Sequence, residues 1–206
     1  MSARLPGARR HVASVLRAAA PTRERTVAAA FRILDLGALR IGSERYLEEN
    51  HTFGLATLRR DQVSVSGHTI SLAFHGKGSI HREQEIVDAT LAKVLTELAG
   101  RSDQGTRLLA WPDDEGAWHD APSSDINAYV ADRMGGTFTA KDFRTWNATV
   151  LMAQVLALGP TPTTERERRA AVAAAYQTVS QYLGNTPTMA RTSYVDPRVV
   201  DLFRDG

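Results

Sequence analysis

The chain of 206 residues contains no cysteine, and only three of its 25 basic residues are lysines. Without cysteine it cannot form disulfides, thiolate nucleophiles or cysteine-based zinc sites. Its six histidines include no pair at i,i+4 spacing, so we expect no metal site. No apolar run approaches the roughly 20 residues that cross a bilayer, so we expect no membrane-spanning segment.

Nucleotide-binding loops are also absent. Neither GxxxxGK[ST] nor GxGxxG occurs, and the GKG at residues 76–78 lacks the rest of either motif. We therefore expect no nucleotide cofactor, and no other cofactor. The net charge of +2 permits nucleic-acid binding but does not establish it.

Apolar residues at helical spacing dominate most of the chain. They predict helices at residues 4–20, 23–39, 44–49, 86–98, 123–133, 140–158 and 166–183. The stretch 101–122 is interpreted as loop-rich, with a solvated acidic turn at residues 113–116.

Between residues 54 and 86 the apolar period falls to two. The pattern predicts a β-hairpin with a glycine turn at residues 66–68 and a third strand at 80–86, with Lys77 at the tip of the turn between the second and third strands. We expect a mainly α (α+β) fold: a single helical domain over residues 1–206, with a small three-stranded antiparallel sheet in a lobe at about 54–86.

A helix stop and a restart lie near the C-terminus. Gly184 ends the long helix, and a short helix then begins with Thr186 as its N-cap and Pro187 at its first position. This short helix leads to Tyr194, and residues 196–197 open another segment. By burial habits alone, Tyr194 would be a packed aromatic residue with a satisfied hydroxyl.

Five sequence motifs follow one another along the chain. They are RIGSERY at 40–46, NHTFGLATL at 50–58, FHGK at 74–77, TAKDFRTW at 139–146 and LGNTPTMARTSYVDP at 183–197. Together they resemble the catalytic domain of the type IB DNA topoisomerases, specifically the poxvirus-like bacterial branch. The resemblance implies a tyrosine recombinase/type IB topoisomerase-like fold and a monomeric enzyme that acts on double-stranded DNA in the cytoplasm, at the nucleoid.

The resemblance also implies roles for individual residues. Tyr194 matches the nucleophile that forms a 3′-phosphotyrosyl link, and Arg40 and Arg144 match the two catalytic arginines. Lys77 matches the general acid. Asn185 stands where poxvirus and eukaryotic members have histidine, so it can donate a hydrogen bond to a phosphate oxygen but cannot supply imidazole's proton chemistry.

These residue types suit phosphodiester exchange. A tyrosine phenol has an ordinary pKa near 10 and needs help to attack. Guanidinium groups donate in pairs to phosphate oxygens, and an ammonium can protonate the leaving oxygen without any metal. The resemblance further implies DNA-binding roles for Lys141 and Tyr46.

Each of these residues, and the chain as a whole, also fits an interpretation other than a type IB topoisomerase. Arg40 and Arg144 singly suit helix-surface ion pairs, and Lys77 suits a solvated turn. The alternatives are a tyrosine recombinase or integrase, or a non-catalytic module that binds duplex DNA. The resembled family begins with a small β-rich domain that closes over the duplex, and we expect this chain to lack that domain.

Overall fold

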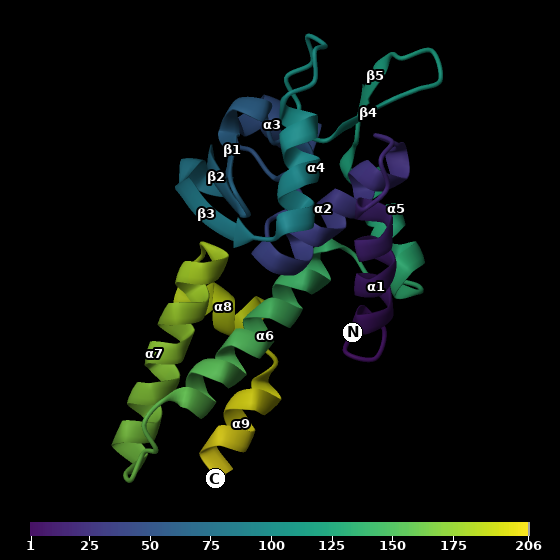
Figure 1. Cartoon of the computed structure of the whole chain (residues 1–206). Helices are drawn as coiled ribbons and strands as arrows, with labels where there is room; N and C mark the ends of the chain where they lie inside the picture. The colour runs from purple at the N-terminus through teal and green to yellow at the C-terminus, as the bar shows by residue number, and fades with distance from the viewer. Residues whose placement is uncertain (206) are drawn as a thin grey trace. The chain divides into compact units, whose positions relative to one another are not determined.

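The computed structural model describes residues 1–205, with only the backbone of Tyr46 and Asn50 (Figure 1). It divides into two compact units, Met1–Lys141 and the part from Asp142 onward, and the division falls in the first turn of one helix. None of the helices described is both long enough and apolar enough to span a membrane.

The first unit begins with two helices, α1 (Leu5–Leu16) and α2 (Arg23–Gly37). As expected, Thr22 caps α2, because its hydroxyl accepts a hydrogen bond from the Arg25 amide at 3.2 Å. Most of α2 is buried, and it contacts α1 and several elements that follow it in this unit. Because apolar residues cover so much of its surface, α2 forms the centre of this unit.

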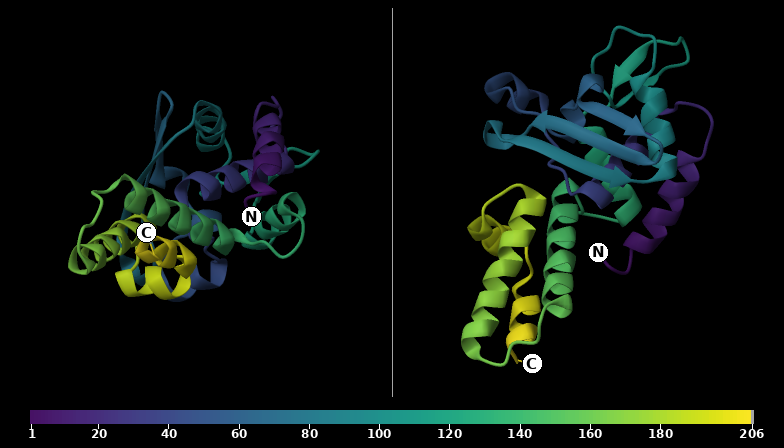
Figure 2. Two further views of the ribbon diagram at one scale, coloured as in Figure 1. Left: turned by 90° about the horizontal axis from the view of Figure 1, so that it is seen from below. Right: turned by 60° about the vertical axis from the view of Figure 1, so that its left-hand side comes forward.

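The predicted three-stranded sheet is confirmed, in the order β1 (Val63–Ser66), β2 (Thr69–His75) and β3 (His81–Val87). Figure 2 (right) shows its strands side by side. Ser66 pairs with Thr69 across a two-residue turn in which Gly67 has φ +59°, a conformation that glycine adopts without strain. Alternate side chains of β2 are buried, which explains the period of two in the sequence.

Two helix boundaries in this unit were predicted wrongly. The helix predicted at residues 4–20 ends at Leu16. The helix predicted from residue 86 begins later, as α4 (Ala89–Ala99), because Ile86 pairs with Ile70 in the sheet and Asp88 caps the helix. The stretch 101–122, predicted to be loop-rich, also contains a two-stranded sheet that the sequence did not predict, β4 (Ala110–Pro112) with β5 (Trp118–Asp120). The acidic turn at 113–116 joins these two strands.

The remaining helices of the first unit are α3 (Glu44–Asn50) and α5 (Ser123–Met134), with short 3₁₀ turns at Leu55–Thr57, Arg60–Gln62 and Lys77–Ser79. Phe31 of α2 is fully buried and packs edge-on against Tyr129 of α5, with ring centroids 6.3 Å apart.

The second unit is entirely helical within the residues described. It comprises α6 (Ala140–Leu158), which crosses the division, α7 (Glu165–Leu183), α8 (Pro187–Ser193) and α9 (Pro197–Asp205). Figure 1 shows α6 and α7 running in opposite directions. The buried positions of α7 include Val172, Ala175, Val179 and Leu183, whose spacing of three and four residues places them on one face.

Candidate active site

The segment that carries Arg40 is held by backbone contacts. The Arg40 carbonyl accepts a hydrogen bond from the Leu55 amide at 2.9 Å, and the next carbonyl accepts one from Ala56 at 2.8 Å. Gly42 and Gly54 face each other so closely that a Cβ built on Gly54 would lie 2.5 Å from the Cα of Gly42. Both glycines are therefore required for this approach.

Lys77 is exposed in the turn between β2 and β3, as the sequence predicts. The turn includes two residues with positive φ, Gly78 at +76° and Ser79 at +55°. At its base the His75 carbonyl accepts a hydrogen bond from the Phe53 amide at 2.7 Å. Residues 53–56 therefore connect the Lys77 turn to the Arg40 segment through backbone hydrogen bonds within the first unit.

Tyr194 lies at the end of α8, in the second unit. The sequence-predicted start of this helix is confirmed: the Thr186 hydroxyl accepts a hydrogen bond from the Met189 amide at 3.2 Å, and Pro187 is the first helical residue. The Tyr194 amide donates to the Ala190 carbonyl at 3.2 Å, and the residue is 7% exposed. Tyr194 is thus anchored by the last turn of a well-capped helix.

Arg144, from α6, lies against the ring of Tyr194. Its guanidinium carbon is 4.9 Å from the centroid of that ring, a distance typical of a cation–π contact. Its Nη2 donates a hydrogen bond to the Leu183 carbonyl at 3.0 Å, and the residue is 3% exposed. The structure therefore brings the predicted nucleophile and one predicted arginine together, with the arginine held at the C-terminal end of α7.

Asn185 follows this helix end directly. Gly184 adopts the left-handed conformation with φ +59°, and the Asn185 amide N–H donates to the Ser180 carbonyl at 3.0 Å. Both polar atoms of the Asn185 side chain are buried, and neither has a hydrogen-bond partner among the residues described. Such groups are costly to leave unsatisfied, by about 1–3 kcal/mol each, and often mark a place for a ligand.

Thr149 is a site residue that the sequence interpretation missed. Its hydroxyl lies 2.8 Å from the Thr145 carbonyl and 3.4 Å from the Tyr194 carbonyl, and it accepts a hydrogen bond from the Asp196 amide at 3.1 Å. One hydroxyl of α6 thus contacts the backbone on both sides of Val195, directly after Tyr194. A threonine inside a helix carries no signal for such a role.

Asp196 completes the loop that follows Tyr194. Its carboxylate accepts a hydrogen bond from the Arg198 backbone amide at 3.0 Å and a second from the Arg198 Nε at 3.0 Å. The pairing with Arg198 lowers the pKa of Asp196 to about 2. The carboxylate is therefore ionised at neutral pH and closes the first turn of α9.

Lys141 and Tyr46 are the two residues with predicted DNA contacts. Lys141 is exposed in the first turn of α6, one helical turn before Arg144. The side chain of Tyr46 lies outside the described part of the structure, so its predicted DNA contact stays a prediction. Within residues 1–205, no three histidine, aspartate or glutamate side chains are grouped so that they could hold a metal ion.

Comparison with known proteins identifies relatives along nearly the whole chain. A family model described as "Eukaryotic DNA topoisomerase I, catalytic core" matches residues 1–201. The chain is 28% identical to DNA topoisomerase 1B of Acanthamoeba polyphaga mimivirus over 180 residues, 82% of this chain and 52% of the relative. It is 24% identical to DNA topoisomerase 1B of Vaccinia virus (strain Copenhagen) over 173 residues, 81% of this chain and 50% of the relative.

A plant protein also matches. DNA topoisomerase 1 of Daucus carota is 28% identical over 137 residues, 66% of this chain but 16% of the relative. The chain thus spans about half the length of the viral relatives and a smaller share of the plant protein. Because the family model covers residues 1–201, the chain belongs to the family of the eukaryotic DNA topoisomerase I catalytic core.

Proposed function

We propose that this chain cleaves and rejoins one strand of double-stranded DNA as a type IB topoisomerase. The observation that carries the proposal is the contact in which Arg144 lies 4.9 Å from the ring of Tyr194. Arg144 is permanently charged, as suits a group that binds phosphate, and it lies beside a phenol at the end of a capped helix. Membership of the family supports the same reaction.

In the forward step the Tyr194 phenol gives up its proton to solvent as its oxygen attacks a backbone phosphorus, and the bond from phosphorus to the 5′ oxygen breaks. The products are a 3′-phosphotyrosyl link and a strand with a free 5′ hydroxyl. Lys77 gives its proton to the departing 5′ oxygen, while Arg40 and Arg144 stabilise the negative charge on the non-bridging oxygens. Rejoining is the reverse reaction, in which the 5′ hydroxyl attacks and Tyr194 leaves.

Asn185 has a distinct part in this proposal. An amide NH₂ can donate to a non-bridging phosphate oxygen, and the two polar atoms of Asn185 have no partner among the residues described. Binding a phosphate would satisfy the donor and recover the free energy that its burial costs.

The phosphodiester bond energy is conserved in the phosphotyrosyl link, so the cycle needs no nucleotide. While the link exists, the freed end can rotate and relax supercoils. The proposal includes action as a monomer, with Lys141 and Tyr46 among the DNA contacts. Sequence-independent phosphate contacts make binding strongly dependent on salt.

The test is relaxation of supercoiled plasmid without ATP and with EDTA present, together with trapping of the covalent adduct on a nicked substrate. We expect relaxation by the wild-type chain and an adduct that maps to Tyr194. Tyr194→Phe should fold normally and form none, whereas the matched controls Tyr129→Phe and Tyr182→Phe should form it. An adduct on another tyrosine, or no adduct with the wild-type chain, would refute the proposal.

A further inference from the structure

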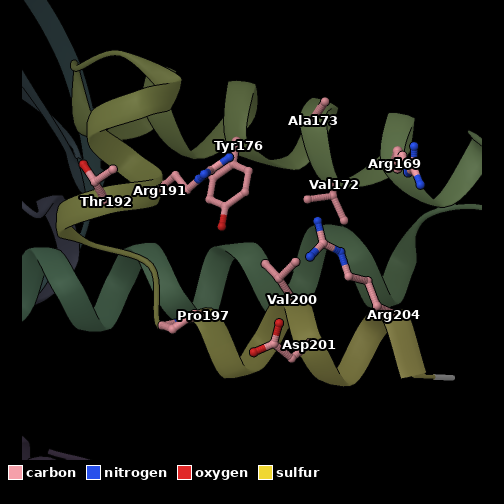
Figure 3. Close-up of a pocket in the computed structure, with 10 residues that line it drawn as sticks. All are labelled: Arg169, Val172, Ala173, Tyr176, Arg191, Thr192, Pro197, Val200, Asp201 and Arg204. Atoms are coloured by element: carbon pink, nitrogen blue, oxygen red, sulfur yellow. The ribbon is translucent and has the colours of Figure 1, made fainter.

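A groove lies among three helices of the second unit, α7, α8 and α9, and Figure 3 shows the side chains that line it. Its volume is about 530 Å³, within the range of pockets that hold small ligands. Apolar side chains form part of its wall, among them Val172, Pro197 and Val200. The groove includes neither Tyr194 nor Arg144.

Positive charge is concentrated in this groove. Each of its three helices contributes one arginine: Arg169 from α7, Arg191 from α8 and Arg204 from α9. Among the residues described, the one carboxylate in the lining is that of Asp201. Three guanidinium groups against one carboxylate favour an anionic occupant.

Two of these arginines have no counterion among the residues described. Arg169 is paired with Glu165, with Nε and Oε1 2.9 Å apart. The guanidinium groups of Arg191 and Arg204, by contrast, form no ion pair or hydrogen bond with any residue in the described part of the chain. Their guanidinium donors are therefore available for a ligand with several acceptor oxygens.

A tyrosine hydroxyl adds a neutral donor. Figure 3 shows the Tyr176 side chain extending into the space between α7 and α9. Burial raises the pKa of Tyr176, while the charges of Arg191 and Arg204 act in the opposite direction and Asp201 adds to the rise. The hydroxyl therefore stays protonated at neutral pH and feels both arginine charges.

We propose that this groove is a second phosphate-binding site, separate from the Tyr194 centre, in which Arg191 and Arg204 hold a phosphate group and the Tyr176 hydroxyl donates to it. Arg191 lies on α8, three residues before Tyr194. A bound phosphate would join α8 to α7 and α9 and so restrain the helix that positions the nucleophile. The phosphate can belong to the DNA backbone away from the cleaved bond or to a free phosphate compound.

The first experiment titrates the ¹⁵N-labelled full chain with sodium pyrophosphate at constant ionic strength and follows the arginine Nε–H signals by NMR. We expect saturable shifts at Arg191 and Arg204, and a loss of affinity of tenfold or more in Arg191→Gln and in Arg204→Gln. Arg166→Gln is the matched control, because Arg166 is exposed on α7 outside the groove. The proposal is overturned if no shift saturates, or if Arg166→Gln weakens binding as much as the groove variants.

The second experiment identifies the source of the phosphate through the salt dependence of binding to a short duplex. If the ligand is the DNA backbone, Arg191→Gln and Arg204→Gln should each reduce the slope of log K against log salt by about 0.9 per phosphate lost, and duplex should displace pyrophosphate. If it is a free phosphate compound, the slopes should equal that of Arg166→Gln and pyrophosphate should remain bound. The titration requires no strand cleavage, so its result is independent of the function proposed above.

Discussion

Gly54→Ala should damage the first unit by separating two backbone segments. A Cβ at residue 54 would lie 2.5 Å from both Cα and N of Gly42 and 2.9 Å from the Arg40 carbonyl oxygen. These are backbone atoms, so no flexible side chain can move away to relieve the contact. The φ angle of Gly54 is −140°, which alanine adopts easily, so the whole effect comes from the steric clash.

The size of the effect follows from the hydrogen bonds at this contact. Restoring an ordinary carbon–carbon separation of about 3.5–4 Å requires the segments to part by roughly 1 Å. That movement would break the Leu55–Arg40 hydrogen bond, now 2.9 Å, and the Ala56–Ile41 bond, now 2.8 Å. Overpacking costs about 1–3 kcal/mol and each lost hydrogen bond about 1 kcal/mol, giving about 3–5 kcal/mol.

Thermal unfolding followed by circular dichroism measures this loss. For a chain of this size about 1 kcal/mol corresponds to roughly 2–4 °C, so the Tm of Gly54→Ala should fall by roughly 6–20 °C. Gly67→Ala is the control: its φ is +59° but nothing lies within 4 Å, so it bears only the left-handed strain of about 1–2 kcal/mol. A Tm for Gly54→Ala no lower than that of Gly67→Ala would refute the reasoning.

Three further predictions concern the site and the fold. In a quenched-flow assay at saturating DNA, Thr149→Val should slow formation of the phosphotyrosyl adduct by about tenfold, which corresponds to the loss of one hydrogen bond. Thr149→Ser retains the hydroxyl and should stay near the wild-type rate. Burial raises the pKa of Tyr129 to about 12, so the stability due to its neutral form should be present below pH 10 and lost between about pH 10 and 12. The urea concentration at the unfolding midpoint, measured at pH 9.5 and at pH 11.5, reports this loss. If the midpoint of the wild-type chain changed between the two pH values only as much as that of Tyr129→Phe, the loss could not be assigned to Tyr129. Lys77→Ala should slow cleavage of an ordinary substrate by about 10²–10⁴-fold, and replacing the bridging 5′ oxygen by sulfur should restore the rate. The same replacement should not restore the rate of Arg40→Ala. Equal defects of Lys77→Ala on both substrates would show that Lys77 is not the general acid.

Local signals in the sequence predicted the second unit well. Helix α6 has the predicted bounds, because a capping region precedes residue 140 and the Gly159–Pro160 pair follows residue 158. The stop at Gly184 and the restart at Thr186 were also predicted correctly, since their left-handed turn and N-cap are properties of single residues. What local signals cannot provide is the packing partner of each helix.

The features that the sequence did not predict depend on partners distant in the chain. The strands β4 and β5 have three residues each, too few to show an alternation of apolar and polar side chains. Their pairing depends on how the rest of the chain folds. The start of α4 was misplaced because Ile86 fits a helical pattern until its pairing with Ile70 is known. Similarly, the buried amide of Asn185 and the bridging hydroxyl of Thr149 become visible only when the chain is folded.

The way Arg60 is held has a consequence for work in concentrated salt. Its guanidinium donates to the backbone carbonyls of Ala99, the last residue of α4, and of three residues in the loop that follows: Arg101, Asp103 and Gly105. Carbonyl oxygens carry no net charge, so added salt screens these bonds far less than it screens exposed ion pairs or phosphate contacts. The loop should therefore stay in place at ionic strengths that dissociate the proposed complex with DNA, so that salt would release the ligand without loosening this part of the fold.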